Sequence, residues 1–338
     1  MFAASSATSA FQPLRYLSLF SGIGGFECAI ERVFPNAQCL GFSEIDKNAL
    51  AVYKAHFPTH RCLGDITNVD FTPFSGHVDL VVGGSPCKDL SIARTADGLR
   101  QGLAGNQSSL FWHFVRCLYE CRPRYFVLEN VASMNARDRD AISVVLQTQP
   151  VMLNTLLFLP QRRRRLFWCN FHVPTLEAAN EIVHFIHRTQ PYAGARLEQV
   201  LETPEQILQQ YPILKHTPRN LEYLLHEEVI IKGQPTGKRR IEVFPSYHCH
   251  SDDDHSYCLG AYLNNAHFNV IVDHRFWPQP FVRKFSPLEV ERLQGFPDHF
   301  THGLAQTQRY QVLGNAVTVP IIVYILCFLK LELGQHAL

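Results

Sequence analysis

Residues 14–25, LRYLSLFSGIGG, join a short apolar run to a glycine-rich turn, and this junction decides how the first half of the chain is interpreted. The run Tyr16–Leu19 has the length and composition of a buried strand, and the helical stretch Glu27–Val33 follows it. Similar strands and helices alternate up to residue 170. The further strands are predicted at Gln38–Phe42, Val78–Val82, Tyr125–Leu128 and Leu156–Phe158, and the further helices at Lys47–Ala55, Leu110–Glu120 and Ala141–Gln147. This alternation predicts an α/β fold with a doubly wound sheet, whose strand-end loops lie along one ligand-binding edge.

The regular pattern breaks near Phe171 and returns near Phe285. Residues 171–280 hold one helical stretch, Leu176–Arg188, among segments rich in Pro, His and Asn. Helical character returns at Phe285–Leu293 and Thr318–Leu331. We therefore predict a catalytic domain made of residues 15–170 and 281–338, interrupted by a smaller lobe at 171–280 and preceded by a flexible tail at 1–14.

Composition excludes several classes of protein. Among 338 residues, 31 Lys and Arg stand against 30 Asp and Glu, so the chain is not basic all over, and a nucleic-acid partner would need clustered charge. No apolar run reaches the ~18 residues of a membrane span, so no membrane partner is expected. The 10 cysteines are irregularly spaced, which favours free thiols in a reducing compartment.

Three loops at successive strand ends predict a nucleoside cofactor. The first, Phe20-Ser21-Gly22-Ile23-Gly24, has glycines that let the backbone approach a ligand closely. The second holds Glu44, at the ~20-residue spacing of a ribose ligand, and Ile45, which could pack on a base. The third holds Asp65 and Ile66. Asp65 could accept a hydrogen bond from an adenine amino group, or it could simply cap a helix.

A thiol and a carboxylate end the next two strands. Cys87 closes the run Gly83-Gly84-Ser85-Pro86-Cys87, and Glu129 follows the strand at 126–128, with Asn130 next to it. Because neighbouring strands lie only ~4.8 Å apart, the two loops can face one ligand. Each residue alone has a plainer explanation, since a cysteine is often a small buried side chain and a glutamate often pairs with an arginine.

Four consecutive arginines, residues 162–165, precede the apolar run Leu166–Trp168. Such a run is usually a solvated charged segment. If it enters a strand, however, side chains alternate between the two faces. Arg163 and Arg165 then share one face, and Arg162 and Arg164 point the other way, toward phosphates or solvent.

Eight motifs in series resemble those of the DNA cytosine-C5 methyltransferases. They are LFSGIGGFE, FSEIDKNAL, GDI, GGSPCKDLS, FVLENV, PQRRRRLFW, LQGFP and VLGNAVTVP, and they cover the chain except residues 171–280. SPCKDLS and RDAISVVLQTQPVM look like the eukaryotic de novo enzymes, whereas PQRRRRLFW and LGNAV look like bacterial modification enzymes. The resemblance implies a Rossmann-like S-adenosylmethionine-dependent methyltransferase sheet with an inserted target-recognition lobe.

The resemblance also implies a mechanism on double-stranded DNA. The Cys87 thiolate would add to C6 of a flipped-out cytosine, so that C5 can attack the methyl group of S-adenosylmethionine. Glu129 would hold N3 and the exocyclic amine, and Arg165 would contact the base carbonyl or a phosphate. Arg163 would help to orient this contact, and Asn130 would position the loops. Residues 88–109 would close over the base, and Arg94 or a residue of the lobe would help to fill the gap that the base leaves. The cofactor would be bound by residues of the strand-end loops: Phe20, Ser21, Gly22, Gly24, Glu44, Ile45, Asp65, Ile66, Pro86, Leu110, Asn315 and Val317.

Two other functions are considered. A tRNA cytosine-C5 methyltransferase would use identical chemistry, and a non-catalytic paralogue is disfavoured because Cys87, Glu129 and Arg165 are all present. The lobe would read DNA sequence, with basic residues suited to phosphates at Lys232, Lys238, Arg239 and Arg240. The His and Cys residues between 248 and 258 match no standard zinc spacing, so no metal is expected. The location would be the nucleus in a eukaryote or the cytoplasm in a bacterium.

Overall fold

The structure is a computed structural model that describes residues 12–86, 110–174 and 281–334, most of 180–210, and four short strands between 228 and 273. Cys87 and the predicted closing loop 88–109 lie outside the described residues. So do Lys232, Arg240 and the His and Cys residues of the segment 248–258. The predictions made for these residues are therefore carried by the sequence.

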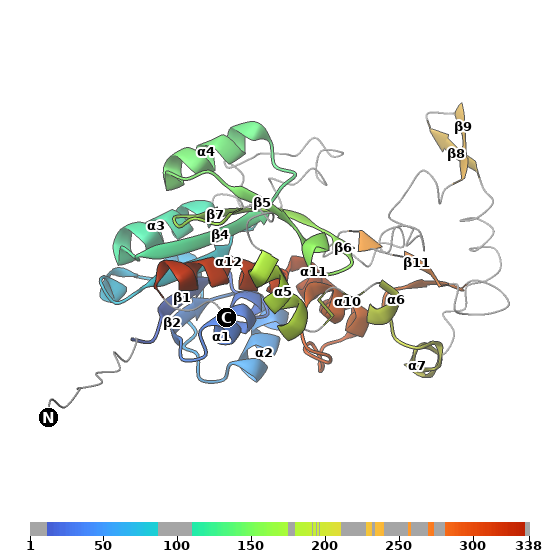
Figure 1. The fold of residues 1–338 in the computed structure, drawn as a ribbon, viewed down its shortest axis with the longest axis horizontal. Helices are drawn as coiled ribbons and strands as arrows, with labels where there is room; N and C mark the ends of the chain where they lie inside the picture. Colours follow the sequence, from blue (N-terminus) through green and yellow to red (C-terminus); the bar gives the residue numbers. More distant parts are fainter. Residues whose placement is uncertain are drawn as a thin grey trace, which may run out of the picture.

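A six-stranded sheet forms the centre of the structure (Figure 1). Its strands lie in the order β2-β1-β3-β4-β7-β5. Their bounds are β1 Arg15–Leu19, β2 Gln38–Ser43, β3 Leu80–Gly84, β4 Tyr125–Val131, β5 Val151–Asn154 and β7 Arg164–Cys169. The first four strands in this order are parallel, and β7 is antiparallel to both neighbours. The predicted α/β class is confirmed, and the carboxyl ends of β1 to β4 meet at one edge of the sheet.

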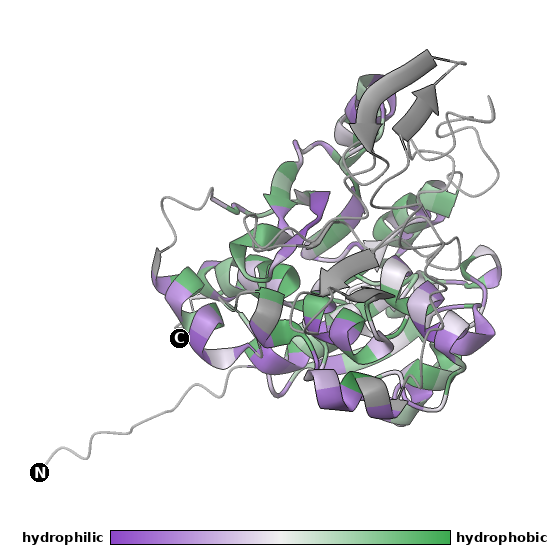
Figure 2. Ribbon diagram, turned by 90° about the vertical axis from the view of Figure 1, so that its right-hand side faces the viewer, coloured by the Kyte–Doolittle hydropathy of each residue, from purple (hydrophilic) through white to green (hydrophobic). Residues whose placement is uncertain are grey.

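Helices cover both faces of this sheet (Figure 1). One face carries α1 (Gly25–Val33), α2 (Lys47–His56) and α12 (Val319–Glu332), and the other carries α3 (Phe111–Cys121) and α4 (Ala136–Leu146). The strands alternate to match, because successive side chains point to opposite faces. Leu80 and Val82 belong to the core between the sheet and α1, α2 and α12, which we call the first core. Val81 belongs to the second core, between the sheet and α3 and α4. Surface helices alternate hydrophilic and hydrophobic stretches in Figure 2, as expected for helices with one buried face.

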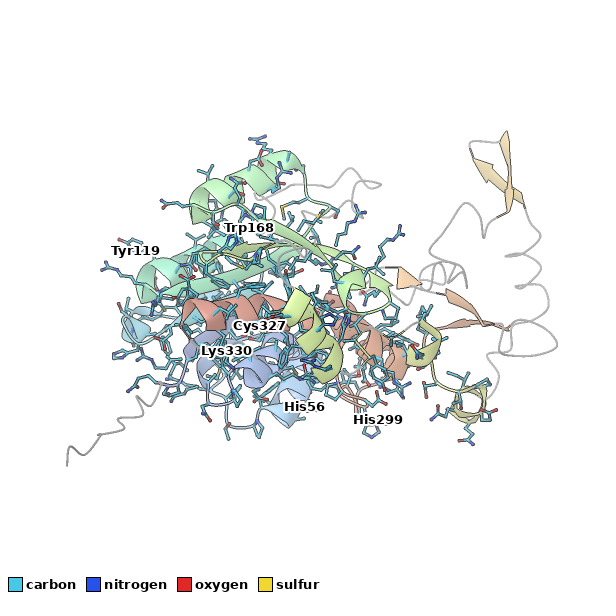
Figure 3. The ribbon with its side chains drawn as sticks, viewed as in Figure 1. His56, Tyr119, Trp168, His299, Cys327 and Lys330 are labelled. Carbon is cyan, nitrogen blue, oxygen red and sulfur yellow. The ribbon has the colours of Figure 1, made fainter. Side chains whose placement is uncertain are left out.

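Helix α12 is apolar around its circumference and forms the inner wall of the first core. Residues 306–332, which comprise α11 (Gln306–Asn315) and α12, are long and apolar enough to cross a membrane, yet 83% of their most apolar window is buried in the fold. The helix packs against α1, and Cys327 lies deep inside, as Figure 3 shows. An all-round apolar helix in this position is a core helix.

Apart from two 3-10 turns between β2 and β3, the remaining described elements lie between residues 155 and 294. They are the 3-10 turn η6 Thr155–Leu157, β6 Gln161–Arg162, α5 Asn180–Thr189, α6 Leu197–Val200, α7 Pro204–Gln210, β8 Glu228–Ile231, β9 Gln234–Arg239, β10 Ser256–Tyr257, β11 Val270–Asp273, β12 Phe281–Lys284 and α10 Pro287–Gln294. Helix α5 falls in the range predicted for the lobe, but its Ile182 and Ile186 are buried in the first core beside α12. Leu14, the last residue of the predicted tail, is buried there too.

One predicted strand is wrong. Residues Leu156–Phe158 were expected in the sheet, but Thr155–Leu157 forms the 3-10 turn η6, and the strand lies earlier, at Val151–Asn154. The Asn154 side chain accepts a hydrogen bond from the Leu156 amide at 3.4 Å, as a capping residue does. Local capping by asparagine therefore ends the strand, although the apolar residues that follow have strand composition.

A carboxyl group is buried in the first core without an ion-pair partner in the described part of the chain. Glu27 of α1 has no exposed surface, and Tyr53 of α2 donates a hydrogen bond to its Oε1 at 2.9 Å. The same hydroxyl lies 3.0 Å from Nδ1 of His60. Burial raises the pKa of Glu27 to about 7, since the charged form loses its hydration.

This pKa predicts a loss of stability as pH rises. The unfolded chain releases the Glu27 proton near its ordinary pKa of 4.5, whereas the folded chain holds it to about 7. The free energy of unfolding should therefore fall between pH 5 and pH 8 by on the order of 2–3 kcal/mol more than in Glu27→Gln, which does not ionise. Urea titrations of both proteins across this range measure the difference. Parallel pH profiles would contradict the assignment.

Candidate active site

The three predicted cofactor loops are joined by hydrogen bonds at the carboxyl edge of the sheet. The Ser21 amide donates to the Ser43 carbonyl at 3.1 Å, which ties the glycine turn to the end of β2. The Gly22 amide donates to Glu44 Oε2 at 2.8 Å. The Ser43 hydroxyl donates to the Gly64 carbonyl at 2.7 Å and so brings in the third loop. Phe20, Gly22 and Gly24 all have positive φ, which gives the turn its sharp bend.

The side chains at this edge fit a nucleoside. The Glu44 carboxylate is held by the Gly22 amide and by the Ile45 and Asp46 amides, each at 2.8 Å, so its orientation is fixed. Ile45 is 63% exposed, so its apolar side chain could pack on the flat face of a base. A Cβ built on Gly22 meets nothing within 4 Å, so the space beside the turn is open. A carboxylate, an apolar surface and open space at one strand end suit a ribose and its base.

Asp65 caps a 3-10 turn, which is one of the two roles that the sequence left open for it. Its Oδ1 accepts a hydrogen bond from the Thr67 amide at 2.9 Å and caps the 3-10 turn η1 (Ile66–Asn68). Bonds from the Thr67 backbone and side chain lower the pKa of Asp65. The side chain is exposed, whereas Ile66 is buried. An exposed carboxylate that is already oriented by its cap can still accept a ligand's amino group.

The segment Asn315–Val317 lies against the glycine turn from the far end of the chain. A Cβ placed on Gly25 would come within 2.7 Å of Val317 Cγ2, so the two segments touch. Arg163 holds this segment in place, because its Nη2 donates to the carbonyls of Gly314 at 3.1 Å and Ala316 at 2.8 Å. Arg163 is buried, and the structure thus brings it to the backbone on either side of Asn315.

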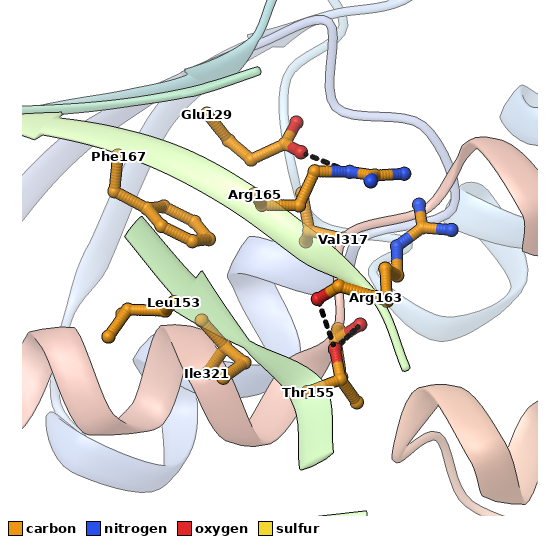
Figure 4. A pocket seen from close by; sticks show the side chains of 9 residues that line it. Glu129, Leu153, Thr155, Arg163, Arg165, Phe167, Val317 and Ile321 are labelled. Carbon is orange, nitrogen blue, oxygen red and sulfur yellow. Dashed lines mark hydrogen bonds and ion pairs between the residues drawn. The ribbon is translucent and has the colours of Figure 1, made fainter. Parts of the chain in front are cut away.

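A carboxylate and a guanidinium meet at the end of β4. The Nε of Arg165 lies 3.0 Å from Glu129 Oε1, and the two side chains are only 17% and 13% exposed. A small cavity beside the pair is lined by Glu129, Arg163, Arg165, Thr155 and Val317, among others (Figure 4). Arg162 and Arg164 are exposed, so the four arginines alternate as the period of a strand predicts.

The ends of β3 and β4 are fixed against each other. Gly84 pairs with Glu129 in the parallel ladder, and a Cβ on Gly84 would lie 3.0 Å from Glu129 Oε2. Asn130 is buried, and its Nδ2 donates to the carbonyl and hydroxyl of Ser85 at 3.2 and 3.0 Å. Asn130 therefore anchors the chain just before Pro86 and Cys87. The described residues end at Pro86, so the position of the thiol is a prediction from the sequence.

Some residues of this site had no signal that singled them out. The sequence marks Gly84 only as part of a strand-end loop. In the structure, the missing side chain at Gly84 leaves room for the Glu129 carboxylate. Thr155 and Thr318 donate and accept in a buried chain that ends at Gln294 Oε1, with distances of 3.2 and 2.8 Å. This chain of hydrogen bonds joins segments more than 100 residues apart, which no local pattern reveals.

Leu110, a predicted cofactor residue, is the residue that precedes α3. Among the described residues, no group of three or more His, Cys, Asp or Glu side chains could hold a metal ion.

Comparisons with known proteins agree on one family. The family model described as "C-5 cytosine-specific DNA methylase" matches residues 14–330. The chain is 28% identical to type II methyltransferase M.NlaX of Neisseria lactamica over 91% of this chain and 93% of that protein. It is also 28% identical to type II methyltransferase M.HpaII of Haemophilus parainfluenzae over 91% and 86% of the two chains.

Solved structures show the same fold. The Entamoeba histolytica methyltransferase EhMeth superposes with a TM-score of 0.65 at 16% identity, over 95% of this chain and 99% of that one. A Dnmt2 structure from Spodoptera frugiperda gives a TM-score of 0.63 at 18% identity, over 94% and 99% of the two chains. At such identities the likeness concerns the fold, and it extends over nearly the whole chain.

The geometry of Glu44 yields a prediction about cofactor binding. Glu44→Ala should weaken binding of S-adenosylhomocysteine by about 1–3 kcal/mol, because the ribose hydroxyls would lose their hydrogen-bond acceptor. Asp46→Ala is the matched control, since Asp46 caps α2 through the Asn48 and Ala49 amides and is not predicted to touch the ligand. Calorimetric titration of both variants makes the comparison. Equal affinity in Glu44→Ala and in the unmodified protein would remove Glu44 from the site.

Proposed function

Because the chain belongs to the C-5 cytosine-specific DNA methylase family, we propose that Cys87, Glu129 and Arg165 carry out the family reaction, the methylation of cytosine C5 in DNA. S-adenosylmethionine is the methyl donor of this family. One observation carries the assignment of residues. Glu129 lies near the end of β4 and pairs with Arg165 of β7 at 3.0 Å. The parallel neighbour of β4 is β3, which leads directly into Ser85-Pro86-Cys87.

The residues of the chain divide the chemistry between them. The Cys87 thiolate forms a bond to C6, and the electron pair of the C5–C6 double bond moves toward C5 as the ring gains a proton at N3. Glu129 binds N3 and the exocyclic amine, and its carboxyl group gives N3 this proton. Arg165 holds the carboxylate in place and presents its remaining N–H groups to the base carbonyl.

Bond formation at C5 is followed by the return of the thiol. When bound, S-adenosylmethionine would supply an electrophilic methyl group to C5, and S-adenosylhomocysteine would leave with the electron pair of the sulfur–methyl bond. Water then takes the proton from C5, and its bonding electrons restore the C5–C6 double bond as the C6–S bond breaks and Cys87 leaves as a thiolate. N3 returns its proton to Glu129. The cofactor site formed by Glu44, Ile45 and the segment 315–317 holds the donor at the edge of the sheet, next to the loop that bears the thiol.

We further propose the domain boundaries and the setting. Residues 15–170 and 281–338 form the catalytic domain, and the lobe at 171–280 reads the DNA sequence. Lys238 and Arg239, in strand β9, would contribute charge for phosphates. The similar curated proteins are bacterial type II methyltransferases, which supports a modification enzyme that works on DNA in the cytoplasm.

A mechanism-based trap tests the nucleophile. Fluorine at C5 cannot leave as a proton does, so DNA with 5-fluorocytosine at the target site should become covalently attached to the enzyme when S-adenosylmethionine is present. Cys87→Ser should abolish the adduct, because a hydroxyl is far less nucleophilic at neutral pH. Glu129→Gln should still bind DNA but form the adduct roughly 10²–10⁴-fold more slowly.

Electrophoresis under denaturing conditions measures adduct formation, and a persistent adduct in Cys87→Ser would show that another residue attacks the base. The other nine cysteines serve as internal controls. Bisulfite sequencing of plasmid DNA from an expressing host reports DNA methylation and its sequence context. Methylation of tRNA without methylation of DNA would contradict the assignment of DNA as the substrate.

The close approach of Gly84 to Glu129 gives a second test of the site. Gly84→Ala adds one methyl group 3.0 Å from Glu129 Oε2, so the carboxylate must shift by a few tenths of an ångström. Because catalysis depends on such placement, we expect kcat to fall roughly tenfold, with little change in thermal stability. Single-turnover methylation measures the effect. An unchanged rate would mean that the position of Glu129 is not critical.

A further inference from the structure

The turn that bears Asp65 and Ile66 gains little order from its own backbone. Between Gly64 and Ser75 the chain forms only two 3-10 turns, η1 and η2 (Thr72–Phe74), and no strand. The bond from the Val69 amide to the Ile66 carbonyl is long, at 3.4 Å. A segment of this kind needs partners from another element if its side chains are to meet a ligand in a fixed place.

Arg116 of α3 is that partner. Its Nη2 donates to the Ile66 carbonyl and its Nη1 donates to the Val69 carbonyl, both at 2.7 Å. The planar guanidinium can hold both carbonyls at once because its donors are arranged as a fork. Two short bonds thus fix the backbone on both sides of η1.

Glu120 lies one helical turn after Arg116 and completes the connection. Its Oε2 accepts a hydrogen bond from the Phe71 amide at 3.0 Å, and its Oε1 lies 3.3 Å from Nη1 of Arg116. The guanidinium carbon of Arg116 lies 5.2 Å from the centre of the buried Phe71 ring. The two charged side chains are only 30% and 20% exposed, which shields the pair from most of the solvent.

We infer that the Arg116–Glu120 pair positions the turn that recognises the base of S-adenosylmethionine, an inference that rests on the proposed function. The pair acts through the Ile66 carbonyl, next to Asp65, and sets where the Asp65 carboxylate lies. Helix α3 begins directly after Leu110, so the pair joins two of the predicted cofactor loops. Arg116 is thus a positioning residue, and its effect should be on the choice of base.

Base selectivity tests this role. The ligands are S-adenosylhomocysteine and S-inosylhomocysteine, in which an oxygen replaces the amino group of the base. Calorimetry on the full-length protein should show that Arg116→Ala binds the adenosyl ligand roughly tenfold more weakly. The inosyl ligand should lose much less affinity, so that the preference between the two ligands shrinks. Arg116→Lys keeps the charge but loses the fork, and its preference should be intermediate.

Arg15→Ala is the matched control for lost stability. Arg15 makes a similar two-pronged contact to Asp79, at 3.0 and 3.1 Å, with exposures of 35% and 32%, but it lies at the opposite edge of the sheet. This variant should keep the wild-type preference. Equal losses for both ligands in Arg116→Ala, or the same change in Arg15→Ala, would overturn the inference. If the unmodified protein binds neither ligand, the proposed function fails instead.

Discussion

The parallel pairing of β3 with β4 is the constraint on which the site depends. Its register places Gly84 opposite Glu129, so the carboxylate rises beside the loop that leads to Cys87. A slip of one residue would turn Glu129 to the other face of the sheet, away from Arg165. Asn130 reinforces the register from the next position, because its amide holds Ser85. The chemistry of the site is thus set by strand geometry before any ligand arrives.

Two arginines hold backbone segments in place at the carboxyl edge of the sheet by donating hydrogen bonds to carbonyl groups. Arg163 binds the carbonyls of Gly314 and Ala316, and Arg116 binds those of Ile66 and Val69. Arg116 binds its two carbonyls through separate nitrogens of the guanidinium fork, whereas both bonds of Arg163 come from Nη2. Hydrogen-bond donors from distant parts of the chain can therefore hold a ligand-binding segment in place when its own backbone makes few bonds.

The sequence predicted the parts of this structure that follow from local pattern. Strands such as Gln38–Phe42 and helices such as Lys47–Ala55 matched the observed β2 and α2 to within one residue at either end, because their apolar periodicity is strong. The family resemblance assigned Glu129 and Arg165 to one base, but their direct contact is seen only in the folded chain. The role of Arg116 had no local signal, since an arginine four residues before a glutamate on a helix usually marks a solvated pair. Its partners lie about 50 residues away, and only the folded chain reveals them.

The burial of α12 also orders events during synthesis. The helix supplies one wall of the core that contains Tyr16, Leu80 and Val82, yet it is translated some 240 residues after the last of these. Until it emerges from the ribosome, the part of this face that α1 and α2 do not cover remains open to association with other apolar surfaces. The same delay keeps Val317 away from the glycine turn. On the proposed assignment of the cofactor site, we therefore expect no cofactor binding by a nascent chain before Val317 and α12 have been made.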